Sequence, residues 1–290
     1  SGQQFIALSK ITVLQALVGT LVLPLLPLMG YYGACLRTGV ISVANMFLLH
    51  RQRPMRISPR LDWPGFRDVI RIGLPLSGAG YIAWSLPISL EGTAVLGWFG
   101  VKMLGLYSMA VFVRTVFVQL TLNMTQVINV NIYEQYGRSG RVRDCVRLIF
   151  LPTALAFLAS LPLIVLGWLT LPWAATLLIP KYVEAVPMMR LTLLVLPVMF
   201  LSLPVTILWA TGRCTDCYLG VTAGFLTFAG LSWFLHRLNF GASGILVAYT
   251  LGKATHVLVS YILIIKLVLK EERSPAPCAI QIATQAAKWK

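Results

Sequence analysis

The stretch EGTAVLGWFGVKMLGLYSMAVFVR, residues 91 to 114, decides the fold, because three charges interrupt an otherwise apolar run at nearly even intervals. Eleven positions separate Glu91 from Lys102, and twelve separate Lys102 from Arg114. The flanking residues 72–90 and 115–133 contain no Asp, Glu, Lys or Arg. As one helix, the 62 residues of this run would be about 93 Å long, whereas the apolar core of a bilayer is roughly 30 Å thick. The run must therefore fold back on itself.

Glycines around Lys102 place the turn of this helical hairpin. They are Gly97, Gly100 and Gly105. With the turn there, Lys102 lies in water, and Glu91 and Arg114 lie at nearly equal depth on adjacent antiparallel helices, each roughly 16 to 18 Å of helix from the turn. A lone charge near the middle of a bilayer costs at least about 2.5 to 3.5 kcal/mol on insertion scales. We therefore expect the two side chains to face inward together.

Composition places the whole chain in the same structural class. The 290 residues are 58% hydrophobic and 11% charged, with a mean hydropathy of +0.80, which lies outside the range of soluble domains. The net charge of +15 comes from basic residues in short loops between apolar runs, which is typical of topology signals. A nucleic-acid-binding face would instead be a basic stripe on a folded surface. The sequence predicts an all-α, polytopic transmembrane helix bundle that binds no nucleic acid.

The apolar runs predict about eight spans. Residues 11–50 contain one charge, Arg37, and a Gly30–Gly33 turn signal, which predicts a hairpin of two spans. Two more spans form the 72–133 hairpin. The remaining four are expected at 148–168, followed by a proline-marked and partly interfacial segment, and at 191–212, 217–235 and 245–265. The basic loop 51–71 is expected to contain an interfacial helix with Pro64 near its first turn.

The distribution of basic residues predicts the orientation. If eight spans alternate, both termini lie on one side, which receives seventeen of the 24 Lys and Arg residues, while the other side receives five. The positive-inside rule makes the richer side cytoplasmic. We therefore expect both ends of the chain in the cytoplasm.

Two interpretations of the intramembrane charges stay open. In one, Glu91 and Arg114 form a salt bridge that only fixes helix register. In the other, Arg114 lines a transport cavity, and Glu91 tunes that cavity or carries a proton. Lys253 lies well inside the last span, with His256 three residues later on the same helix face, and we expect it to face a cavity. Arg37 lies close to the expected outer turn, where it can snorkel.

The sign of these charges indicates the substrate. Arg114 and Lys253, together with Arg37, outnumber Glu91, which favours an anionic group such as a phosphate or pyrophosphate. We therefore name Arg114, Lys253 and Arg37 as candidate substrate-binding residues. Glu91 and His256 are the candidate ion-coupling residues or charge partners.

The sequence contains no motif typical of an enzyme active site or a metal site. Only nine acids and three histidines are present, with no phosphate-binding glycine motif and no nucleophile elbow. Of five cysteines, only Cys214 and Cys217 form a CxxC, and other candidate ligands lie far away in sequence. We expect no enzyme activity, no cofactor and no metal. Because residue 1 is Ser, we also expect the chain to be a fragment or a truncated product.

Four stretches resemble one known family. They are IGLPL at 72–76, LGLYSMA at 104–110, YGRSG at 136–140, and IPKYVEAVPMMRLTLLVLPVMFLSLPVTILWATGR at 179–213, the last being the most specific. In these the sequence resembles the bacterial polysaccharide and O-antigen flippases of the multidrug/oligosaccharidyl-lipid/polysaccharide (MOP) exporter superfamily. The resemblance implies a two-lobed exporter fold whose first four spans are missing here. Residues 1–50 then contain the last hairpin of the first lobe, 51–71 a cytoplasmic basic loop, 72–268 the six-helix second lobe, and 269–290 a cytoplasmic tail.

The resemblance also implies a function. Such proteins move an undecaprenyl-pyrophosphate-linked oligosaccharide from the cytoplasmic to the periplasmic leaflet of the bacterial inner membrane, by alternating access coupled to an ion, proton or sodium. The expected partners are this anionic lipid-linked oligosaccharide and membrane lipids. Two alternatives remain: a multidrug cation antiporter of the same superfamily, and a membrane glycosyltransferase or polymerase.

Overall fold

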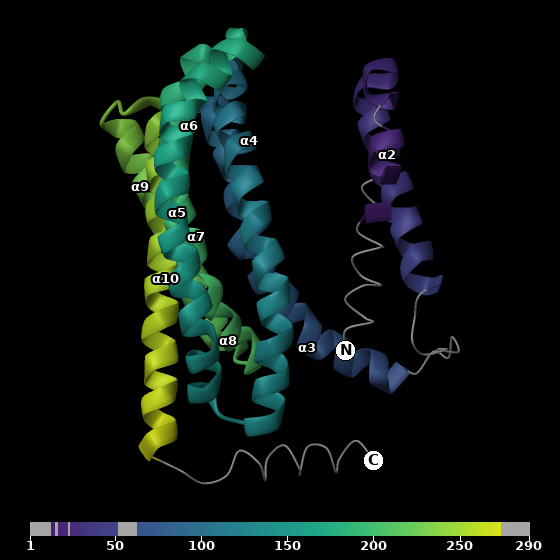
Figure 1. The fold of residues 1–290 in the computed structure, drawn as a ribbon, viewed down its shortest axis with the longest axis vertical. Helices are drawn as coiled ribbons and strands as arrows, with labels where there is room; N and C mark the ends of the chain where they lie inside the picture. The colour runs from purple at the N-terminus through teal and green to yellow at the C-terminus, as the bar shows by residue number, and fades with distance from the viewer. Residues whose placement is uncertain (1–12, 15–16, 23, 52–62, 274–290) are drawn as a thin grey trace. The chain divides into compact units, whose positions relative to one another are not determined.

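The computed structural model describes residues 13–14, 17–22, 24–51 and 63–273, which form helices joined by short turns and contain no strand (Figure 1). The chain divides into two units, Ser1–Phe66 and Arg67–Lys290. Five described helices are long and apolar enough to cross a membrane, and all of them lie largely or wholly in the second unit. The predicted class, an all-α polytopic membrane bundle, is confirmed.

In the first unit, α2 runs without interruption from Leu25 to Arg51. The turn predicted at Gly30–Gly33 is therefore wrong, because these residues lie inside the helix. The chain turns instead at residues 22 and 24, immediately before α2 begins. Pro24 and Pro27 explain the difference, since a proline is tolerated at the start of a helix, where its missing N–H would have no partner anyway. Of the predicted first span, residues 11–12, 15–16 and 23 lie outside the described residues.

The second unit begins within α3, which runs from Trp63 to Gly80 and has Pro64 as its second residue. The sequence predicted this start. It did not predict that the helix continues, first through a π-helical turn at Tyr81–Ser85 and then into α4, Leu86–Ser139. A π-turn adds one residue to the usual helical repeat and commonly marks a functional site.

Gly100 reverses the chain inside α4. Its φ of 79° and ψ of 178° are non-helical, and α4 consists of two antiparallel halves that meet there (Figure 1). A side chain disfavours a backbone of this kind, so glycine is the residue expected at the turn. Lys102 lies beside the turn with its side chain 87% exposed. The predicted hairpin and the exposed lysine at its apex are both confirmed.

Two predicted boundaries change in the middle of the chain. The span expected at 148–168 is part of one helix, α5, which extends from Val142 to Leu178 and contains Pro152, Pro162 and Pro172. The proline-marked segment expected after residue 168 belongs to this same helix as far as Leu178. The single span expected at 191–212 is instead a series of short helices. They are η2 (Pro180–Ala185), α6 (Val186–Leu193), α7 (Val195–Leu201), η3 (Leu203–Val205) and α8 (Thr206–Ala210).

This broken segment occupies the interior of the second unit. In Pro180–Leu201, 56% of the most apolar window is buried, a larger share than in any of the other four long apolar helices. Its prolines lack the N–H groups that continuous helical hydrogen bonding needs, and polar side chains add local bonds to backbone carbonyls, as Thr206 Oγ1 does to that of Leu203 at 2.8 Å. Neighbouring helices protect the broken backbone from lipid.

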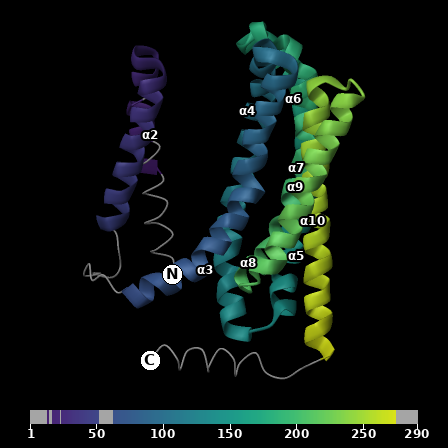
Figure 2. The same ribbon diagram turned by 180° about the vertical axis from the view of Figure 1, so that it is seen from behind.

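The last two helices, α9 (Cys214–Arg237) and α10 (Gly241–Arg273), confirm the predicted final pair of spans (Figure 2). They are in close contact at two glycines. A Cβ on Gly224 would lie 2.7 Å from the carbonyl oxygen of Gly252, and a Cβ on Gly252 would lie 2.8 Å from that of Gly224. Neither position has room for a side chain, so the two backbones lie in direct contact, as small residues permit between membrane helices.

Candidate functional site

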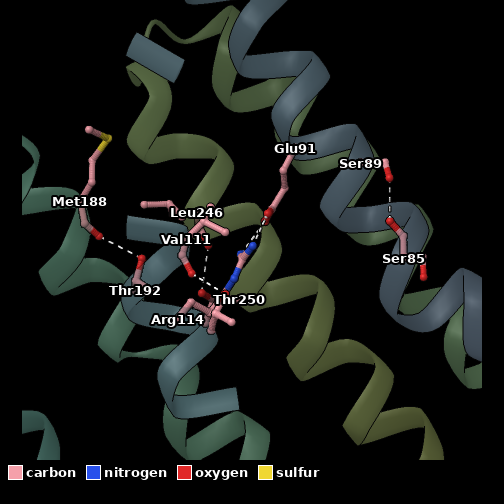
Figure 3. Close-up of polar contacts among 10 residues, drawn as sticks. Ser85, Ser89, Glu91, Val111, Arg114, Met188, Thr192, Leu246 and Thr250 are labelled. Carbon is pink, nitrogen blue, oxygen red and sulfur yellow. Dashed lines mark hydrogen bonds and ion pairs between the residues drawn. The ribbon is translucent and has the colours of Figure 1, made fainter. Parts of the chain in front are cut away.

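A buried ion pair joins the two halves of α4. Arg114 Nη1 donates a hydrogen bond to Glu91 Oε1 at 2.7 Å, and Nη2 donates a second bond to Oε2 (Figure 3). The side chains of Arg114 and Glu91 are 3% and 1% exposed. This fork-to-fork geometry satisfies both carboxylate oxygens and is the strongest form of the arginine–carboxylate pair. The structure thus brings together the two charges that the sequence predicted to meet.

Helical periodicity explains why these charges point inward. Before Gly100, the buried residues of α4 are four positions apart: Pro87, Glu91 and Val95. After Gly100, Tyr107, Ala110 and Arg114 are buried at intervals of three and four. Residues at this spacing share one helix face. Each charge therefore lies on the same face as the core residues around it, and the fold-back places the two faces against each other.

Two tyrosines enclose the pair. The ring centroid of Tyr249, on α10, lies 4.0 Å from Cζ of Arg114 and 5.8 Å from Nζ of Lys253. Tyr107 lies beside the Glu91 carboxylate, although its buried hydroxyl forms no hydrogen bond within the part of the chain that the structure describes. A cation over an aromatic face is stabilised by the ring quadrupole. The ring of Tyr249 thus connects the ion pair to Lys253.

Lys253 lies one turn after Tyr249 on α10, and its Nζ donates a hydrogen bond to the carbonyl oxygen of Ala83 at 2.6 Å. Ala83 lies in the π-turn, four residues before Pro87. In an α-helix, the N–H of the residue four positions later would donate to this carbonyl. Here that residue is proline, which has no N–H. The lysine ammonium supplies a donor in place of that missing group.

His256 lies on the same side of α10 as Lys253. Both line a small cavity of about 20 Å³ together with Ala83, Phe228, Tyr249 and Gly252. Such a volume holds roughly one water molecule. Within the described residues, the buried Nε2 of His256 has no hydrogen-bond partner. The two side chains thus share the lining of one small cavity, and a transport cavity at Lys253 stays a prediction.

The charges of this cluster are unequal. Among the described residues that surround Tyr249, two are basic, Arg114 and Lys253, and one is acidic, Glu91. The side chain of Lys253 is partly buried, whereas that of Arg114 is 3% exposed and paired with Glu91.

Arg37 lies in the first unit. It is half-buried within α2, and its Nε donates a hydrogen bond to the carbonyl oxygen of Gly19 at 3.2 Å. Its expected place beside an outer turn is wrong, because α2 continues through residues 30–33. A part in substrate binding stays a prediction for this residue.

Sequence reasoning missed three residues of the site. Tyr249 precedes Lys253 by four positions and Tyr107 precedes Arg114 by seven, and both spacings place the tyrosine on the face of a charge already singled out. The third residue is Ala83, whose carbonyl is freed by Pro87, four positions later. Searching one and two turns from each intramembrane charge would have found the two tyrosines.

Comparisons with known proteins place this geometry in a known fold. No protein-family model and no curated protein matches the chain. Solved structures do match it. One is an outward-facing multidrug resistance MATE family transporter of the MOP superfamily, with a TM-score of 0.70, 16% sequence identity, and coverage of 90% of this chain and 63% of the other. An inward-facing structure described in the same terms has a TM-score of 0.72 at 15% identity, with coverage of 92% and 65%.

A third similar structure is a MOP superfamily transporter from Pyrococcus furiosus, for which the reverse polarity of the binding pocket suggests a different function. Its TM-score is 0.71 at 15% identity, with coverage of 89% of this chain and 61% of the other. This chain therefore spans less than two thirds of the length of each of the three transporters. At this level of identity the likeness establishes the fold, which is the fold of MOP superfamily transporters.

Proposed function

We propose that the protein is a membrane transporter that moves a lipid-linked oligosaccharide with an anionic pyrophosphate group from the cytoplasmic to the periplasmic leaflet. Its likeness in fold to transporters supports the general activity. The observation that carries the substrate class is the balance of charge around Tyr249, where two basic side chains, Arg114 and Lys253, accompany one acid, Glu91. A pyrophosphate is a strong acceptor for an ammonium group at low dielectric.

The candidate residues then have distinct roles. Lys253 makes the first contact with the headgroup, and Arg114 contributes a second contact once its pair with Glu91 opens. Glu91 and His256 provide the groups through which a proton or sodium ion is coupled to that opening. Substrate binding by Arg37 is proposed for the first unit by itself. Each of these roles is part of the proposal.

A reconstituted transport assay tests the proposal. The 290-residue chain is inserted in vesicles containing a fluorescent undecaprenyl-pyrophosphate oligosaccharide, and the arrival of the glycan in the other leaflet is followed with a membrane-impermeant quencher. We expect Lys253→Met to lower the rate at least tenfold and Lys253→Arg to retain part of it. Lys102→Met, at an exposed position, is the matched control and should transport normally. Equal rates for Lys253→Met and the unaltered chain would refute the assignment.

A multidrug cation antiporter is the second candidate, because two of the similar structures are multidrug resistance transporters. In that case the acid, Glu91, would bind the substrate, and removing a nearby positive charge would not hinder it. Efflux of ethidium from cells separates the two functions. A cation antiporter loses efflux in Glu91→Gln and keeps it in Lys253→Met, whereas we expect no ethidium efflux from any variant.

We further propose a bacterial inner-membrane location with both ends of the chain in the cytoplasm. Basic residues at the α4–α5 junction and at the end of α10 support this orientation, since positive charge favours the cytoplasmic side. Single cysteines at Lys102 and Arg138 test it. A membrane-impermeant thiol reagent applied to intact cells should label position 102 and spare position 138, and the reverse pattern would contradict the orientation.

A further inference from the structure

Two side chains hold the bent helix at the start of the second unit. The hydroxyl of Tyr218, on α9, donates a hydrogen bond to the carbonyl oxygen of Pro75, and Nζ of Lys253, on α10, donates one to that of Ala83, each at 2.6 Å. The two carbonyls are eight residues apart, roughly two turns of helix. They therefore lie on one side of the helix, the side that meets α9 and α10.

The sequence from Gly78 to Pro87 favours bending of this helix. It contains Gly78 and Gly80, followed by the π-turn Tyr81–Ser85 and then Pro87. Gly78 leaves the space that the tyrosine needs, because a Cβ there would lie 2.5 Å from the Tyr218 hydroxyl. Glycine, π-turns and proline are each recognised causes of a helix kink, and here they follow one another within ten residues.

The bond to Ala83 is the one that a ligand can compete for. The acceptor is a neutral carbonyl, whereas a phosphate oxygen is charged and binds an ammonium group more strongly. The cavity beside this bond has room for about one water molecule, at roughly 20 Å³, and cannot contain a phosphate headgroup. For an anion to replace Ala83 in this cavity, the π-turn must move away from α10.

We propose that the hydrogen bond from Lys253 to Ala83 is a latch, and that the anionic headgroup opens it by replacing the carbonyl as the acceptor. This proposal rests on the proposed function and specifies how the substrate changes the conformation. When Lys253 binds the anion, the Ala83 carbonyl loses its donor, and Pro87 cannot supply another. The turn at residues 81–85 must then rearrange, and the kink between α3 and α4 changes with it.

Distances between spin labels test the latch in the whole 290-residue chain, in lipid nanodiscs, with its five cysteines replaced by serine. Labels at Leu74→Cys and Leu258→Cys, both at exposed positions on α3 and α10, report the bend. The variants are Lys253→Met, Lys253→Arg, and Lys253→Met combined with Pro87→Ala, which restores an N–H for Ala83. Lys102→Met is the control. The ligand probe is farnesyl pyrophosphate, with farnesol as its neutral counterpart.

We expect a single distance population for the unaltered chain, for Lys253→Arg and for the control. Lys253→Met should show a second population without any ligand, and adding Pro87→Ala should remove it. Farnesyl pyrophosphate should produce the same second population in the unaltered chain, and farnesol should not. An unchanged single population in folded Lys253→Met would overturn the latch.

The two proposals can fail separately. In the first case, Lys253→Met shifts the distances but farnesyl pyrophosphate does not. The hydrogen bond from Lys253 to Ala83 then holds the helix. That result refutes both the opening of this bond by an anion and the proposed anionic substrate. If farnesyl pyrophosphate is transported or bound while neither it nor Lys253→Met shifts the distances, the latch is refuted and the proposed function stands. Because the ligand arm uses the labelled chain with Lys253 and Pro87 intact, misfolding of a Lys253 or Pro87 variant cannot account for its result.

Discussion

Arg114 and Glu91 form a two-bond ion pair across the Gly100 turn, and both side chains are almost completely buried. Moving two charges away from water is costly, and this pair recovers the cost through complete hydrogen bonding of the carboxylate and contact with the Tyr249 ring. The same pair therefore fixes the register of the hairpin and neutralises the arginine.

The energetic dependence of each partner on the other can be measured. Removing one member of a buried pair leaves an uncompensated charge and typically costs about 3 to 5 kcal/mol, whereas removing both is often close to neutral. We expect Glu91→Gln and Arg114→Gln to destabilise the protein strongly, and the double variant to be more stable than either. Unfolding of the purified protein in detergent gives the three values.

The exposed pair Arg138–Glu134 is the control for this comparison of single and double variants, because surface ion pairs contribute about 0 to 1 kcal/mol to stability. A coupling energy between Glu91 and Arg114 as small as that of the control would contradict the buried pair.

Gly100 should be the least replaceable glycine of the hairpin. Its φ of 79° and ψ of 178° suit glycine alone, so Gly100→Ala should destabilise the protein by about 1 to 3 kcal/mol. Gly97 lies in the helix, and a Cβ there would meet no atom within 4 Å. Gly97→Ala should therefore stabilise the protein by about 0.5 to 1 kcal/mol. Thermal unfolding distinguishes the two, and equal effects would argue against a turn at Gly100.

The contact between α9 and α10 should tolerate no added methyl group. In Gly224→Ala the new Cβ would lie 2.7 Å from a backbone oxygen, so the helices must separate, at a cost of about 1 to 3 kcal/mol. Gly230, on the same helix, has open space and serves as the control. Because Gly224 also lies against His256, we expect Gly224→Ala to lower transport, while Gly230→Ala keeps both stability and transport.

Glu271 should stabilise the start of α5. Its Oε2 accepts hydrogen bonds from the backbone N–H groups of Val142 and Arg143, at 3.1 and 3.3 Å, and these have no partner within the helix. Glu271→Ala should cost about 0.5 to 2 kcal/mol, as the loss of a helix cap does. Faster amide hydrogen exchange at residues 142 and 143 would report the loss directly.

The neighbouring acid provides a matched comparison. Glu272 pairs with Arg143 at 3.0 Å, but both side chains are about half exposed. Glu272→Ala should therefore change stability by less than about 1 kcal/mol and leave the exchange of residue 142 unaffected. If the two alanine variants behave alike, Glu271 does not cap α5.

The hairpin of α4 could be predicted because its constraints are local and strong. Charges inside an apolar run must pair, glycines mark a turn, and helix rise converts sequence distance into depth. These rules identified Glu91 and Arg114 as partners. They failed at Gly30–Gly33, where glycines lie inside a continuous helix, because a glycine permits a turn without requiring one.

Prolines were ambiguous for a similar reason. Pro152, Pro162 and Pro172 lie within the single helix α5, while the segment 180–210, also rich in proline, is divided into short helices. A proline removes one N–H in both cases. Whether the helix continues depends on what neighbouring helices offer to the freed carbonyls, and sequence distance does not contain that information.

By itself, the sequence determined that this chain is a bundle of apolar helices, where its α4 hairpin turns, and that Glu91 and Arg114 must meet. Each of these follows from the cost of exposing charge or backbone to lipid, which depends on residue type and spacing. Only the tertiary structure decided that Lys253 binds the Ala83 carbonyl and that Tyr249 lies between the two basic groups. Those contacts join residues up to 170 positions apart, and their geometry depends on the close approach of α9 and α10 and on the π-turn.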